Sequence, residues 1–78
     1  MSNLSIYDDA FIETFLVDKK DLPGLKYQSV TEWDSVGHMS LMTLFEESFE
    51  IELDTDDIIN FSSYEAGKEI LSKYGVKF

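Results

Sequence analysis

Apolar residues along this chain recur three and four positions apart, which is the spacing of one face of an α-helix and not the alternation of a β-strand. The clearest case is the stretch 35–50, where Leu41, Met42, Phe45 and Phe49 fall together on a helical wheel. We therefore expect an all-α fold. With 78 residues there is room for one domain, residues 1–78, and one modest core.

Caps and breakers divide the chain into four expected helices, the third of them short. These helices run from near Ser5 or Tyr7 to about Val17, from Asp34 or Ser35 to near Glu50, from about Thr55 to Asn60, and from about Ser63 to Tyr74. Ser62 or Ser63 is the expected cap of the last helix, and Gly75 its stop. The predicted architecture is a four-helix bundle.

In the first helix, Phe11, Phe15 and Leu16 are expected to form the apolar stripe, and Asp8 and Asp9 to fall in the first turn. A long loop, Asp21 to Trp33, should follow, because Pro23-Gly24 interrupts helical structure. Its apolar side chains should pin it to the core, with Trp33 as an anchor. The other pinning residues are Leu22, Leu25, Tyr27 and Val30.

Charge is distributed unevenly along the sequence. Six Lys and no Arg stand against 16 acidic residues, giving a net charge of −10, and no Lys or Arg occurs from Tyr27 to Gly67. Because phosphate backbones are bound through Lys and Arg, we expect no nucleic-acid partner. An acidic surface favours basic protein partners, although the acids could also serve solubility alone.

Other functional classes are disfavoured by what the sequence lacks. There is no Cys, so disulfides and thiolate metal sites are excluded. We see no secretory signal and no apolar run of the roughly 18 residues that a membrane span needs. A cytoplasmic monomer without a membrane partner is therefore expected.

The second expected helix presents an unusual outward face. Ser35 lies in its first turn, and Val36 and Met39 are apolar yet fall on the outward arc beside it. Single exposed apolar residues are common, but two that flank a first-turn serine and are rimmed by acids indicate a docking patch. The arc also carries Thr43, Glu46, Glu47 and Glu50.

These residues match a known pattern. Trp33-Asp34-Ser35-Val36, followed by an amphipathic helix ending in Phe45-Glu46-Glu47-Ser48-Phe49, resembles the acyl carrier proteins, whose signature is Asp-Ser-Leu at the start of the second helix. Ile51-Glu52-Leu53 and the residues to Ile58 resemble the third-helix region of that family. Phe61-Ser62-Ser63-Tyr64 resembles the start of the fourth helix. The likeness covers about Glu32 to Leu71.

The resemblance implies a carrier that performs no catalysis itself. A 4′-phosphopantetheine arm would be attached to Ser35 by a phosphopantetheinyl transferase, which supplies coenzyme A, Mg²⁺ and the base, with Asp34 capping the helix. The arm's terminal thiol would hold an acyl or related group as a thioester for visiting acyl-loading and acyl-transferring enzymes with basic patches. The residues expected to bind partners are Val36, Met39, Glu46, Glu47, Glu50, Asp56 and Asp57.

The departures from the family pattern are few. Val36 replaces the leucine of the signature. Gly37 and Ser40 stand where many carriers of fatty-acid synthesis have acids. The form Trp-Asp-Ser-Val-Gly-His, residues 33–38, is similar to that of carriers of specialised pathways. Gly37 should also cost the helix about 1 kcal/mol relative to Ala.

Three other readings compete with the carrier. The chain could be an acidic interaction adaptor without a prosthetic group. Ser35 and His38 could act as nucleophile and base, but no oxyanion hole or orienting group is evident, and His38 falls near the core stripe, so a structural position under the loop is expected. The acids 54–57 suggest calcium, but an EF-hand counted from Asp54 would need Gly at the position of Ile59, so we expect no such metal site.

Overall fold

The computed structural model describes residues 2–78, and this part of the chain is built from helices. The helices are α1 (Asn3–Phe15), a short 3₁₀ helix η1 (Lys19–Gly24), α2 (Ser35–Phe49), α3 (Thr55–Asn60) and α4 (Tyr64–Lys73). Between residues 2 and 78, the β-type pairing is limited to an isolated bridge that joins Lys26 to Ser63. The prediction of a helical fold is confirmed.

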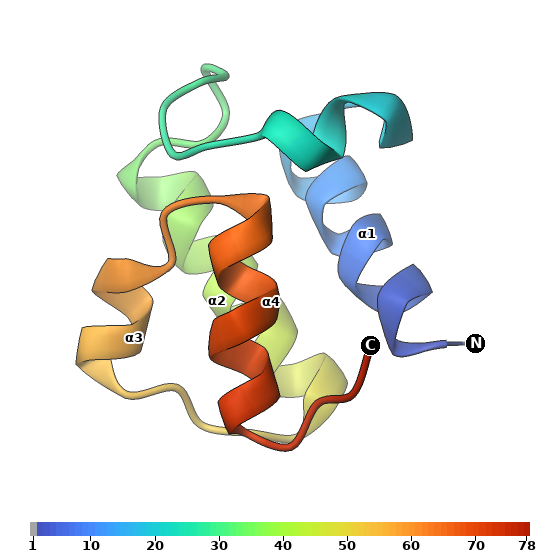
Figure 1. Cartoon of the computed structure of the whole chain (residues 1–78). Helices are drawn as coiled ribbons and strands as arrows, with labels where there is room; N and C mark the ends of the chain where they lie inside the picture. Colours follow the sequence, from blue (N-terminus) through green and yellow to red (C-terminus); the bar gives the residue numbers. More distant parts are fainter. Residues whose placement is uncertain (1) are drawn as a thin grey trace.

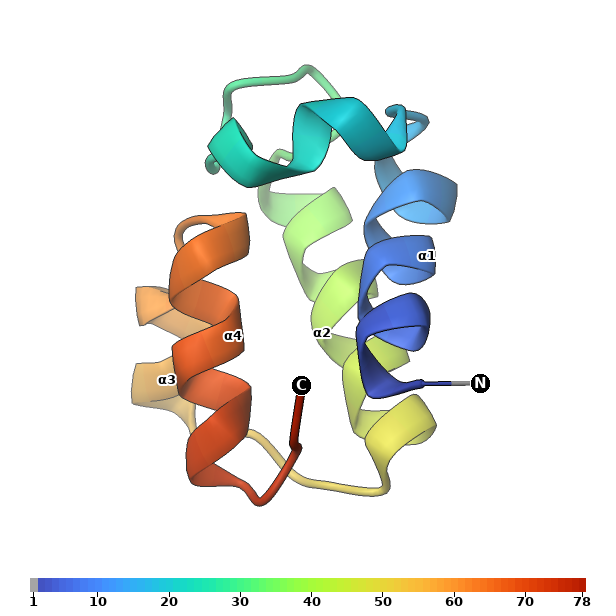
Figure 2. The ribbon, with the colours of Figure 1, turned by 45° about the vertical axis from the view of Figure 1, so that its right-hand side comes forward.

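The helices surround a single core (Figures 1 and 2). α1 and α2 lie side by side, and η1 crosses above the end of α1. α3 lies beside α4 on the side away from α1. The C-terminal segment returns toward the beginning of α1, where the Asn3 side-chain amide donates to the Lys77 carbonyl at 3.0 Å. The two ends of the described chain therefore lie near each other.

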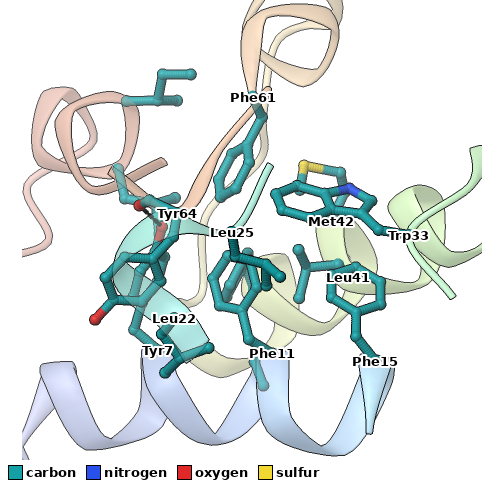
Figure 3. Close-up of a cluster of buried hydrophobic side chains, with 14 of the residues drawn as sticks. Tyr7, Phe11, Phe15, Leu22, Leu25, Trp33, Leu41, Met42, Phe61 and Tyr64 are labelled. Carbon is teal, nitrogen blue, oxygen red and sulfur yellow. Dashed lines mark hydrogen bonds between the residues drawn. The ribbon is translucent and has the colours of Figure 1, made fainter. Parts of the chain in front are cut away.

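Aromatic rings fill the core (Figure 3). Phe11 is fully buried, and its ring centroid lies 5.5 Å from that of Trp33, 5.8 Å from that of Phe45 and 5.4 Å from that of Tyr64. Trp33 and Phe45 are themselves completely buried. These rings come from α1, α2, α4 and the long loop, so the core joins all four segments. Aromatic pairs at these separations stabilise a fold beyond the free energy gained by burying their apolar area.

α1 begins and ends earlier than predicted. The Ser2 hydroxyl accepts a hydrogen bond from the Ser5 N–H at 3.1 Å, and this N-cap starts the helix before Ser5. At the other end Leu16 adopts a left-handed conformation, φ 57°, so the helix stops at Phe15. The shift moves Asp8 and Asp9 out of the first turn.

The new register of α1 corrects two predicted positions. Asp8 is buried and accepts a hydrogen bond from the Tyr64 hydroxyl at 2.5 Å. Burial, together with this bond to a carboxylate, raises the pKa of Tyr64 above its usual range. Leu16 is not part of the apolar stripe: it is 79% exposed, because the left-handed residue that ends the helix turns away from the core.

The predicted loop from Asp21 to Trp33 is partly helical. Its first residues belong to η1, in which the bonds join positions three apart; the Leu25 N–H, for example, donates to the Leu22 carbonyl at 3.0 Å. Leu22 and Leu25 are buried, as predicted for residues that pin this segment. Pro23 did not end the helical structure, because a short 3₁₀ turn tolerates it.

The rest of the loop is fixed to the beginning of α4. The Tyr27 N–H donates to the Ser62 carbonyl at 2.9 Å, and the Tyr64 N–H donates to the Leu25 carbonyl at 2.9 Å. These bonds flank the isolated bridge at Lys26. A loop held by backbone bonds on both sides is a firm support for the residues that follow it, including the start of α2.

The remaining helices follow the prediction closely. α2 and α3 occupy the expected residues, and α4 begins after Ser63, whose hydroxyl accepts from the Ala66 N–H at 3.0 Å. In the predicted stripe of α2, Leu41, Met42 and Phe45 are buried. Phe49 is only partly buried, because the last turn of α2 lies at the edge of the core.

Truncating a central ring tests this description of the core. Phe45→Ala should lower the free energy of unfolding by about 3–5 kcal/mol, because a buried aromatic side chain is lost and a cavity remains. Leu16→Ala, at an exposed position, should change it by less than about 0.5 kcal/mol. Urea unfolding of both variants is the measurement. Equal losses would contradict the assigned core.

Candidate functional site

The candidate site lies at the N-terminus of α2, where Ser35 is the first helical residue and is exposed. Asp34 precedes it in an extended conformation, and its Oδ1 accepts a hydrogen bond from the Gly37 N–H at 2.8 Å. The predicted cap by Asp34 is therefore confirmed. The cap orients the first turn so that the Ser35 side chain lies at the surface.

Gly37 explains how closely the loop approaches this turn. A Cβ atom placed on Gly37 would lie 2.0 Å from the Glu32 carbonyl oxygen and 3.2 Å from Cε1 of Phe15. The sequence suggested that glycine costs the helix stability here. In the structure this loss is offset by packing: without a side chain at position 37, the loop backbone can pack directly on α2.

A hydrogen-bonded chain joins the loop, α2 and α3. The buried Trp33 indole N–H donates to Nδ1 of His38 at 2.9 Å, and Nε2 of His38 lies 2.7 Å from the Ile58 carbonyl. Because an indole nitrogen only donates, Nδ1 must accept, and Nε2 then carries the proton and donates to the carbonyl. His38 thus occupies the structural position under the loop that the sequence predicted.

The contacts of Ser35 do not include His38. Its Oγ lies 3.2 Å from the hydroxyl of Tyr27, while both ring nitrogens of His38 bond to Trp33 and Ile58. A serine nucleophile needs a base within hydrogen-bonding reach. The structure does not bring these two residues together as such a pair.

A cleft opens beside Ser35, between α2, α3 and the long loop. Its volume is about 340 Å³, and most of its wall is apolar. Tyr27, Ser35 and His38 all line this cleft. The full lining consists of Tyr27, Ser35, His38, Met39, Ile58, Ile59, Phe61 and Ser62.

Exposed apolar side chains lie near Ser35 on two helices. Val36 is 75% exposed and Met39 is 51% exposed, as the helical wheel predicted. Ile59, on α3, is 70% exposed. Met39 and Ile59 border the cleft, while Val36 and Met39 also line a shallow groove along the outward face of α2. The exposed apolar surface around Ser35 therefore comes from two helices.

The acids that were grouped as partner-binding fall into two classes. Glu46 Oε2 accepts from the Leu53 N–H at 2.8 Å, and Asp57 accepts from Lys73 and from the Tyr74 hydroxyl. Hydrogen bonds from Lys73 and Tyr74 hold the pKa of Asp57 below its usual range. These two acids bind parts of their own chain.

The other acids of this set face solvent. Glu47, Glu50 and Asp56 are exposed. In the part of the chain from residue 2 onward, the ion pairs are Lys68 with Glu65 and Lys73 with Asp57, so neither pair uses these three acids. Their charge remains available at the surface: Glu47 lies in the last turn of α2, Glu50 at its C-cap and Asp56 in the first turn of α3.

Sequence reasoning missed the contributions of Tyr27 and of α3. Tyr27 was expected only to pin the loop, yet its hydroxyl reaches Ser35. Ile58 and Ile59 were not singled out, because a six-residue helix is too short for its wheel to separate buried from exposed positions. The sequence did contain a signal for an apolar surface on this helix, since the adjacent Ile58 and Ile59 follow the acidic pair at 56–57.

Comparisons with known proteins do not assign the chain to a family. Neither the protein-family models, the curated proteins nor the solved structures gave a match to the chain. Among residues 2–78, none of the helices has the length and apolar character to cross a bilayer. In the same residues, His, Asp and Glu side chains form no group of three that would hold a metal ion.

The close approach at Gly37 yields a direct test of how the first turn of α2 is held. Gly37→Ala should destabilise the protein by about 1–3 kcal/mol, because the added methyl group overlaps the Glu32 carbonyl, although alanine is the better helix former. Gly24→Ala is the matched control: no atom lies within 4 Å of the added Cβ, so stability should be kept or slightly raised. Thermal unfolding compares the two. A Gly37→Ala variant as stable as the control would contradict the packing described.

Proposed function

We propose that this protein is a carrier that holds a 4′-phosphopantetheine arm on Ser35 and presents the attached group to partner enzymes. The observation that carries the proposal is the exposed Ser35 at a capped helix N-terminus, beside an apolar cleft. The order of two long helices, a long loop between them and a short third helix also supports the proposal, because the resemblance to acyl carrier proteins implies that order.

The residues present suit a phosphodiester at this position. The first N–H groups of a helix have no partner within the helix, and the dipole places partial positive charge there, so an anion linked to Ser35 is favoured. Asp34 holds the Gly37 N–H and keeps the turn in place. The arm would supply a thiol that carries an acyl group as a thioester, which the chain, having no Cys, cannot supply itself.

Several features support a carrier over a hydrolase. Both ring nitrogens of His38 are engaged by Trp33 and Ile58, so His38 is not poised to take a proton from Ser35. A carrier needs no activated serine, because the transferase provides the base. It needs an accessible hydroxyl and a surface for visiting enzymes, and Val36, Met39 and Ile59 are exposed next to that hydroxyl.

Arm attachment tests the proposal. After incubation with coenzyme A, Mg²⁺ and a phosphopantetheinyl transferase, the wild-type protein should gain the mass of one arm. Ser35→Ala should gain none and keep its helical circular dichroism, because the position is exposed and alanine is a good helix former. Ser40→Ala, which removes another exposed serine of α2, is the control and should be modified normally.

Intact mass separates the outcomes of this experiment. Attachment that persists in Ser35→Ala would show that the site is wrong. A wild-type protein that stays unmodified would contradict the carrier function and favour an acidic adaptor, which uses the same face of α2 without a prosthetic group.

The exposed acids are proposed to bind basic patches on the partner enzymes. Glu47→Lys should slow arm attachment at low salt, because it reverses an exposed charge that would attract a basic patch. The effect should shrink at higher salt, since exposed charges are screened over about 8 Å at physiological ionic strength. Stability should change little, because the Glu47 side chain faces solvent. Glu46→Lys is a contrasting variant that should also lower stability, since Glu46 accepts from the Leu53 N–H. Attachment rates and melting temperatures are measured together. An unchanged rate for Glu47→Lys at low salt would assign these acids to solubility alone.

A further inference from the structure

The hydroxyl of Tyr27 lies 3.2 Å from Oγ of Ser35, although the two residues belong to different segments. Tyr27 comes from the long loop and Ser35 from α2. The pair lies on the rim of the cleft between α2 and α3. The loop before α2 therefore contributes a polar group, the Tyr27 hydroxyl, that contacts the candidate attachment oxygen of Ser35.

The position of Tyr27 is fixed from several sides. Its backbone N–H donates to the Ser62 carbonyl at 2.9 Å. Its ring meets the Trp33 ring edge to face at a centroid distance of 6.3 Å, and the His38 ring at 5.5 Å. Since Trp33 is buried and bonds to His38, the hydroxyl is presented from a packed support and not from a free surface side chain.

Modification of Ser35 determines which of the two hydroxyl groups donates the hydrogen bond. Before modification either oxygen can be the donor. An exposed serine would otherwise sample three staggered rotamers, and a fixed partner favours one of them. Once Oγ is esterified it has lost its proton, so in the modified protein only Tyr27 can donate. The best acceptor near it would then be a charged phosphate oxygen.

On the basis of the carrier function proposed above, we propose that Tyr27 is a positioning residue for arm attachment. Its hydroxyl holds Ser35 in the reactive rotamer and then donates to the phosphodiester at the base of the arm. In the step itself the Ser35 Oγ–phosphorus bond forms and the bond from that phosphorus to adenosine 3′,5′-bisphosphate breaks. The nucleotide leaves, and the serine proton passes to the base of the transferase.

Kinetics of Tyr27→Phe test the first part of this role. With a phosphopantetheinyl transferase and coenzyme A, the variant should show a kcat about three- to fivefold below wild type, which corresponds to one lost rotamer restraint or hydrogen bond. KM for the carrier should be unchanged, because Val36, Met39 and Glu47 are untouched. Ser72→Ala is the control: it removes a hydroxyl that donates to the Lys68 carbonyl within α4, away from Ser35, and should keep the wild-type kcat.

Phosphorus NMR of the modified proteins provides a readout that a purely structural role would not move. The ³¹P resonance of the phosphodiester should shift between wild type and Tyr27→Phe, and should coincide between wild type and Ser72→Ala. Equal kcat values or equal ³¹P shifts for wild type and Tyr27→Phe would overturn the role of Tyr27 alone. A loss of kcat matched by Ser72→Ala would overturn it as well. A wild-type protein that accepts no arm would overturn the carrier function, and this proposal with it.

Discussion

The buried indole of Trp33 is the contact on which the arrangement around Ser35 depends. Its ring lies nearly parallel to that of Phe15 at a centroid distance of 5.0 Å, which ties the loop to α1. Its N–H bonds to His38 on α2, and His38 in turn bonds to the Ile58 carbonyl on α3. Because a buried donor without a partner costs about 1–3 kcal/mol, this chain of bonds fixes one placement of the three segments. The cleft beside Ser35 follows from that placement.

This construction separates stability from the proposed function. The rings that hold the fold are buried, while Ser35, Val36 and Met39 are exposed on the opposite face of α2. α3 has no fully buried residue. Ile58 packs against the core, and polar contacts such as those of Asp57 with Lys73 and Tyr74 also hold the helix. Changes at this exposed face should therefore affect arm attachment and partner binding more than they affect the packing of the core.

The sequence predicted those features that depend on local pattern, and it missed those that depend on tertiary contacts. The bounds of α2 and α3, the Asp34 cap and the exposure of Val36 follow from periodicity and capping chemistry. The left-handed Leu16 could not be anticipated, because nothing in its residue type favours that conformation. Glu46 was expected to face partners, but its bond to the Leu53 N–H depends on how the chain turns after α2. The contact between Tyr27 and Ser35 likewise arises only once the loop is folded.

We propose Ser35 as the single attachment point, because its place at the capped start of α2 and its contact with Tyr27 set it apart from the other serines. Fragmentation mass spectrometry of the transferase-treated wild-type protein tests this claim most directly, since it assigns the added mass to a residue. Every fragment that contains the arm should carry it on Ser35. An arm on Ser40, Ser62 or any other hydroxyl residue, or no arm at all, would contradict it.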